Sequence, residues 1–580
     1  MQKNFRPKNL YSCKKVGEIN FIMLINKLVI KLPKEKRKIE LISNIERNWY
    51  LPVSAIAFFS LSSTLTVGYF IGVILAFFMV FIISSQISSI RNYTKKNKIW
   101  LQILSALTAI GICWCAKISF CTKWILSPKT QALSLYIPNA IYIMEIISII
   151  GALVGFFFVY FCTIIFYKKA INIITECSLF SKINKLEIFF YSLILLITSI
   201  TMIYIFLQTN AFYESNYGYD IIYTSDPPFR KEDNVYMALN HPENDIRQPL
   251  FAVFSAPLVS IPYLIGNLFS SVVIQAILMN LVQIVLMFLA NFMLTKVMNL
   301  SRIQRMSFIF LISFTYTNLL FSLMMEQYIF AYFWLMLCVY TIFTNRHFTN
   351  FLIFGAIGTL STSVFLLPFL SKKLINENLK KWFADIMKYS LEFILLMIFF
   401  CKFDVFYNLK LKILSLSSFT AQNLTIIDKF RQYTEFIHNC IFAPTAGETL
   451  NSTGHISWQL NQIIDINIIG IIIFLLVIIS AILNKNKEFT LFSISWVAFS
   501  VLILFIFGWG TQENGLILYS LYFGWAFIVL IFQLIQYIEE NCKIKFLIPL
   551  FCIITVFALV LINIPAMMQL INFAIKEFPL

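Results

Sequence analysis

Long apolar runs, separated by short polar connections, constrain the fold of this chain more than any other feature. A transmembrane helix needs about 20 mostly apolar residues, and runs of this kind recur from residue 50 to residue 566. Only 13% of the residues are charged, against about 25% in a soluble domain. The sequence therefore predicts an all-α polytopic membrane protein. The predicted spans cover residues 50–66, 69–90, 100–117, 139–166, 186–208, 270–296, 306–323, 327–344, 351–370, 387–403, 466–484, 489–508, 515–537 and 546–566.

Clusters of lysine and arginine between these spans indicate which connections face the cytoplasm. Positive residues concentrate in short cytoplasmic connections, so the net charge of +17 reflects topology and does not indicate a nucleic-acid partner. A cytoplasmic N-terminus satisfies this rule as far as Arg346. Beyond Arg346 it holds only if residues 351–370 split into two short helices, around Gly355, Gly358 and the polar run 359–363.

With that split, the C-terminus and the two longest polar loops lie outside. The predicted parts are a basic cytoplasmic N-terminus (1–48), accessory transmembrane hairpins (49–170), a transmembrane core (180–566) with outer loops 209–260 and 404–465, and an outer tail (567–580).

The longest densely polar run between two hydrophobic blocks lies at residues 220–250, in the first outer loop. Asp220 and Asp226 follow the span 186–208, so we expect them at the outer membrane surface. A carboxylate there can act as general base on a hydroxyl or hold a divalent ion. Two prolines after Asp226 restrict its backbone, which suits a catalytic group. The alternative interpretation is a solvated acidic loop.

Residues 234–248 predict a short interfacial helix and a turn, and the prolines that follow, Pro257 and Pro262 among them, are expected to break any long helix. Arg247 and His241 are candidates to bind a phosphate, which arginine contacts bidentately. His241 fits equally well as a loop histidine that caps a turn.

Glu326 interrupts an apolar stretch, and Glu513 lies in a glycine-rich turn before Tyr519. A carboxylate that faces lipid costs about 2.5 kcal/mol or more, so we expect Glu326 at an outer turn or in a polar cavity. Tyr519 begins an aromatic face that suits a sugar ring or a prenyl chain, although an interfacial aromatic belt gives the same pattern. Glu145 is a lone acid within the span 139–166.

Taken together, these segments resemble the integral-membrane glycosyltransferases of the GT-C superfamily, which includes protein mannosyltransferases and aminoarabinose transferases. The resemblance covers about residues 186–566 and leaves residues 1–170 as an addition. Gln248 stands where relatives often have a histidine before Pro-Leu. The matching features are the span 186–208, Ser225-Asp226-Pro-Pro, the run 245–251, the split segment 351–370, and Glu513 followed by Leu518-Tyr519-Ser520.

The resemblance implies inverting transfer of a sugar from a polyprenyl-phosphate donor to a glycan, lipid or protein acceptor, on the outer face of a bacterial cell membrane. No cofactor is predicted, and a divalent ion at the acids stays open. A transporter or flippase for lipid-linked sugars is one alternative, and it predicts charges at the bilayer midplane. A glycan polymerase or ligase is the other. The implied roles are Asp226 as general base with Asp220 second, Arg247 and His241 on the leaving phosphate, and Glu326, Glu513 and Tyr519 around the sugar or acceptor.

Overall fold

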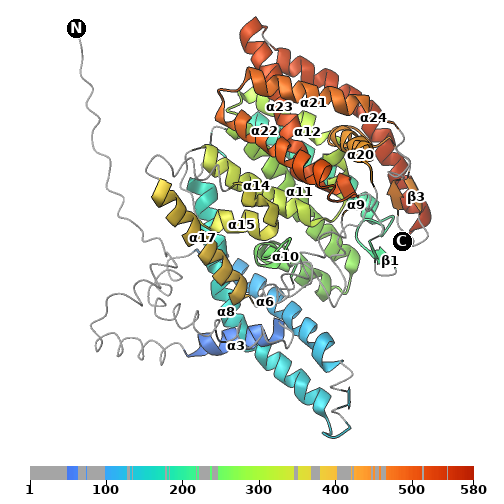
Figure 1. Cartoon of the computed structure of the whole chain (residues 1–580). Coiled ribbons are helices and arrows are strands. Elements are labelled where there is room, and N and C mark those ends of the chain that lie inside the picture. The colour runs from blue at the N-terminus through green and yellow to red at the C-terminus, as the bar shows by residue number, and fades with distance from the viewer. Residues whose placement is uncertain are drawn as a thin grey trace.

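The chain folds into a bundle of membrane-length helices in a computed structural model (Figure 1). The structure describes residues 49–62, 74, 98–126, 131–132, 135–176, 179–181, 183–216, 219–220, 236–237, 246–344, 350–366, 379–400, 420, 424–445, 448–450, 456–458, 465–511, 515–544 and 546–580.

Within these residues, eight helices are long and apolar enough to cross a membrane. A ninth span results if α12 (Arg302–Ser313) and α13 (Tyr316–Leu323), which meet at a bend of 66°, count as one. This confirms the predicted all-α polytopic membrane fold. The eight are α6 (Ile99–Phe120), α8 (Ala140–Glu176), α9 (Lys185–Phe206), α10 (Phe251–Leu268), α11 (Val272–Val297), α22 (Glu488–Ser500) with the π-helical turn Val501–Ile506, α23 (Ser520–Cys542) and α24 (Leu547–Glu577).

The described residues also contain further α-helices and two small hairpins. The helices are α3 (Tyr50–Ser62), α14 (Gln327–Phe343), α15 (Asn350–Thr359), α17 (Leu379–Phe399), α20 (Ile426–Asn439) and α21 (Ile468–Leu483). The antiparallel strand pairs are β1 (Ser215–Asn216) with β2 (Tyr219–Asp220), and β3 (Glu448–Leu450) with β4 (Ile456–Trp458).

The centre of the bundle consists of α14, which is buried along almost its whole length, and of α23, which is buried from Ser520 to Leu534. These buried parts are apolar on nearly all sides, which is the pattern of a helix surrounded by protein or lipid. Trp334 of α14 and Trp525 of α23 are among the largest fully buried side chains. Helices α3, α6 and α8 form a second apolar cluster, which lies below α10 in Figure 1.

The prolines after Arg247 do not break the following helix, contrary to our expectation. Helix α10 is continuous through Pro257 and Pro262. Interior prolines are tolerated in membrane proteins where neighbouring groups cover the disturbed backbone. Helix α8 packs against this stretch, where the Tyr167 hydroxyl donates a hydrogen bond to the carbonyl oxygen of Pro257.

Helix α24 extends into the residues that were predicted as an outer tail. Helix α24 passes Pro565 and ends at Glu577, because Met567, Leu570 and Ala574 continue a buried face at helical spacing. The chain end then packs against the end of α9, where Thr209 Oγ1 donates to the carbonyl oxygen of Phe578 at 2.6 Å.

The predicted split of residues 351–370 falls at Leu360. Helix α15 passes through both glycines and ends at Thr359, and a 3-10 helix follows at Ser361–Leu366. The remainder of that segment lies outside the described residues, as does the predicted span 69–90 apart from Ile74.

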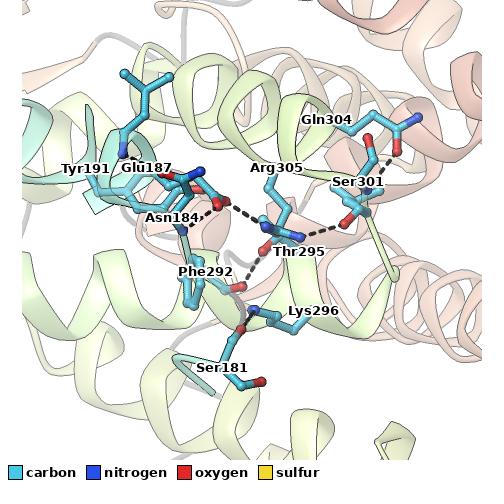
Figure 2. A network of polar contacts seen from close by, with 12 residues as sticks. Ser181, Asn184, Glu187, Tyr191, Phe292, Thr295, Lys296, Ser301, Gln304 and Arg305 are labelled. Atoms are coloured by element: carbon cyan, nitrogen blue, oxygen red, sulfur yellow. Dashed lines mark hydrogen bonds and ion pairs between the residues drawn. The ribbon is translucent and has the colours of Figure 1, made fainter. Parts of the chain in front are cut away.

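Basic residues from separate connections gather at one end of the bundle, here called the basic end (Lys185, Lys296, Arg302 and Arg305). Lys296 Nζ, at the end of α11, donates to the carbonyl oxygen of Ser181 at 3.0 Å. Arg305 of α12 donates to Glu187 Oε1 of α9 through Nε at 3.0 Å and Nη2 at 2.7 Å (Figure 2). The start of α9, the end of α11 and the start of α12 therefore lie together at the basic end.

Candidate functional site

The non-helical segment between α13 and α14 positions Glu326. Irregular backbone at membrane depth needs partners from the protein for its polar groups. Two amides inside the apolar helix α11 provide them. Asn280 Nδ2 donates to the carbonyl oxygen of Ser322 at 2.8 Å, and Gln283 Nε2 donates to that of Glu326 at 3.4 Å. Both amides are fully buried, so α11 holds the break in one conformation.

Glu326 itself occupies the N-cap of α14. Its Oε1 accepts a hydrogen bond from the backbone N–H of Gln327 at 3.0 Å, and the positive end of the helix dipole favours a carboxylate there. The residue is only 1% exposed. Glu326 therefore lies in the turn between α13 and α14 and is buried there.

Arg247 lies at the end of the first polar loop and is tied to the split segment by backbone contacts. Its carbonyl oxygen accepts from the N–H of Ser361 at 2.7 Å, and the N–H of Leu250 donates to the carbonyl oxygen of Gly358 at 2.8 Å. A Cβ at Gly358 would lie 2.8 Å from Leu250 Cβ, so this approach requires glycine. The two features that the sequence singled out, Arg247 and the split helix, are thus directly packed together.

A second loop residue, Tyr236, secures the same region. Its carbonyl oxygen accepts from Ser255 Oγ of α10 at 2.7 Å, and its hydroxyl accepts from Gln283 Nε2 at 3.2 Å. Gln283 therefore contacts both the loop and the backbone of Glu326.

Tyr519 is held by the turn that precedes α23. Trp509 Nε1 donates to the Tyr519 hydroxyl at 2.5 Å. Gly510 has a φ of +78°, and a Cβ there would lie 2.6 Å from the Tyr519 ring. The turn therefore needs glycine both for its left-handed backbone and for the close approach of the ring.

Tyr328 joins these parts into one site. Its ring meets the Tyr519 ring edge to face, with the centroids 5.3 Å apart. Its hydroxyl is hydrogen-bonded to Tyr519, and its charged neighbours are Arg247 and Glu326. We call Arg247, Glu326, Tyr328, Trp509 and Tyr519 the Arg247 cluster. It combines a half-buried guanidinium, a buried carboxylate and an aromatic wall, from segments far apart in the sequence.

The predicted site residues divide into two groups. Arg247, Glu326 and Tyr519 come together in the Arg247 cluster. Asp220 lies in β2, where its backbone pairs with Ser215. Asp226, His241 and Glu513 lie outside the described residues, so their roles stay predictions.

Polar residues of the loop 404–465 have structural partners instead. Glu435 of α20 accepts from Thr445 at 2.9 Å and from Asn467 Nδ2 at 2.7 Å. His438 stacks on Phe442, with ring centroids 5.3 Å apart. Burial lowers the pKa of His438 below its usual value. These contacts therefore join α20 to the start of α21.

Sequence reasoning missed Tyr328, Trp509 and Gln283. The signals were present, because Tyr328 follows Glu326 by two positions and Trp509 lies in the same turn as Glu513. Gln283 is a buried amide in an apolar span, which itself indicates a structural or functional partner. Glu145, by contrast, is exposed on α8 and does not face the protein interior.

No protein-family model matches the chain, and no characterised protein or solved structure matches it.

Proposed function

We propose that this chain is a membrane glycosyltransferase that moves a sugar from a polyprenyl-phosphate donor to a hydroxyl acceptor at the Arg247 cluster. The observation that carries the proposal is the meeting of Arg247, Glu326, Tyr328 and Tyr519 at one place in a membrane protein. Arginine binds phosphate oxygens bidentately, which suits the phosphate of such a donor.

In the proposed reaction, the acceptor oxygen attacks the anomeric carbon while a carboxylate removes the hydroxyl proton. The bond between the anomeric carbon and the phosphate oxygen breaks, and the polyprenyl phosphate leaves with the electron pair. Asp226 is the proposed general base and Asp220 the second candidate. Arg247 neutralises the charge that develops on the leaving phosphate, and His241 is a second candidate for this contact.

The remaining residues of the site bind and orient in this proposal. The aromatic rings of Tyr519 and Trp509 form one wall for the sugar or the acceptor. Glu326, fixed at the start of α14, accepts hydrogen bonds from sugar hydroxyls, and Glu513 has the same proposed role. The acceptor is a glycan, a lipid or a protein, and the proposed location is the outer face of the cell membrane.

The experiment is a transfer assay with the full chain in liposomes. It uses a panel of radiolabelled polyprenyl-phosphate sugars and acceptors extracted from cell envelopes, and it measures labelled acceptor and released polyprenyl phosphate. Loss of a hydrogen bond to a charged group costs about 1.5–3 kcal/mol, so Arg247→Gln lowers kcat/KM about ten- to a hundredfold. Asp226→Asn abolishes transfer while the protein still inserts and folds.

Two variants serve as matched controls for charge removal. Glu540→Gln changes an exposed acid of α23, and Arg431→Gln removes a partly exposed arginine that pairs with Asp428. Neither residue lies in the Arg247 cluster, so we expect both variants to keep wild-type transfer. The assignment of Asp226 or Asp220 as general base is wrong if Asp226→Asn and Asp220→Asn both leave transfer intact, and the enzyme proposal is wrong if no donor and acceptor of the panel gives labelled product. Movement of the intact labelled donor across the vesicle, without transfer, supports the flippase, and chain extension of a lipid-linked glycan supports the polymerase.

A further inference from the structure

An open groove runs along the outside of the bundle between α9 and α12, beside the basic end. Its volume is about 700 Å³. The walls are mainly apolar, and a few polar residues lie at the start of α12. The lining residues are Leu186, Phe190, Ile303, Met306 and Phe310, with Ser301, Arg302 and Ser307.

The groove faces the surroundings of the bundle and not its core. Leu186 is 53% exposed and Ile303 is 50% exposed, and α9 is apolar enough to cross a membrane. A molecule in this groove therefore reaches it from the lipid phase, with a hydrocarbon part against these walls.

The basic end carries more positive than negative side chains, since its two lysines and two arginines face the carboxylates of Glu187 and of Glu539, which accepts from Gln304 at 3.1 Å. Arg305 is engaged by Glu187 and by the carbonyl oxygen of Leu300 (Figure 2). Arg302 is only partly buried and has no hydrogen-bond or ion-pair partner among the residues that the structure describes. It is the first residue of α12, whose first turn holds no acid. The helix dipole adds further positive potential at that position, and exposed Lys185 begins the neighbouring helix.

We propose that this groove binds an anionic phospholipid, with its phosphate at Arg302 and an acyl chain along the apolar walls. Charge complementarity supports this occupant, since basic pockets between membrane helices bind anionic head groups. A guanidinium also matches phosphate geometry in two hydrogen bonds. The site is separate from the Arg247 cluster and does not depend on the function proposed for it.

Native mass spectrometry of the delipidated full chain tests the proposal. Dioleoylphosphatidylglycerol and dioleoylphosphatidylcholine are titrated separately. We expect one phosphatidylglycerol to be retained more tightly than phosphatidylcholine. Arg302→Gln weakens that retention about tenfold, since it removes a charge-assisted contact. Ser307→Trp fills the groove without changing its charge and weakens the retention too.

The control is Lys487→Gln, which removes an exposed positive charge from the connection before α22 and leaves retention unchanged. Unaltered elution of each variant in size-exclusion chromatography shows that it folds. Equal retention of both lipids, or unchanged retention in Arg302→Gln, overturns the proposal. Displacement of phosphatidylglycerol by an equal amount of farnesyl phosphate overturns the assignment of the occupant to a phospholipid.

Discussion

The ion pair between Glu187 and Arg305 predicts an asymmetric response to mutation. Glu187 Oε1 accepts from Arg305 Nε and Nη2, and Glu187 Oε2 accepts from the N–H of Asn184 at 3.1 Å. The Glu187 side chain is fully buried, whereas 12% of the Arg305 side chain is exposed. Removing Arg305 leaves the buried Glu187 carboxylate without its ion-pair partner, whereas removing Glu187 leaves the Arg305 guanidinium, which is still partly exposed to water.

The magnitudes follow from this difference in exposure. Breaking a buried pair by deleting one partner costs about 3–5 kcal/mol. For Arg305→Met we expect about 3 kcal/mol, because Asn184 and Tyr191 still donate to the carboxylate. For Glu187→Gln we expect about 1–2 kcal/mol, since the amide oxygen still accepts from Arg305. The double variant costs less than Arg305→Met alone, as it buries no charge.

The assay is unfolding of the purified protein by titration of the SDS mole fraction, read as the free energy of unfolding. Glu540→Gln, at an exposed position of α23, is the control and stays within about 0.5 kcal/mol of wild type. A larger loss for Glu187→Gln than for Arg305→Met refutes the argument from burial. So does a double variant that loses the sum of the two single changes.

Three further predictions concern the Arg247 cluster and its supports. Tyr519→Phe removes the hydrogen-bond acceptor for Trp509 and lowers the free energy of unfolding by about 1 kcal/mol. It also lowers the rate of transfer. The control Tyr204→Phe, at an exposed position of α9, changes neither stability nor transfer. Gln283→Leu removes the amide that donates to Tyr236 and to the backbone of Glu326. We expect the free energy of unfolding, measured by the same SDS titration, to fall by about 1–3 kcal/mol. A fall below about 0.5 kcal/mol contradicts the proposed role of Gln283. Burial lowers the pKa of His438 from the ordinary 6.5, so the unfolded chain binds the proton more readily and the free energy of unfolding falls as the pH drops below 6.5. We expect a weaker fall for His438→Gln than for wild type when both are measured at each pH. An identical fall contradicts the prediction.

The sequence determined the class of fold, because span length and charge position are local properties. Apolar runs of sufficient length predicted membrane helices, and the positive clusters predicted which connections share the cytoplasmic side. Glu326 was identified because a charge in an apolar stretch is costly unless it has a partner, and Arg247 because arginine contacts phosphate bidentately.

Tertiary structure decided where helices continue and which residues meet. Pro257 and Pro262 lie inside α10, where neighbouring helices stabilise a backbone that local rules predict to break. Tyr328 links Arg247 to Tyr519, which lie 272 residues apart in the sequence, and Gln283 fixes the break before α14 from another helix. Such contacts depend on packing between distant segments, and no local pattern of residues encodes them.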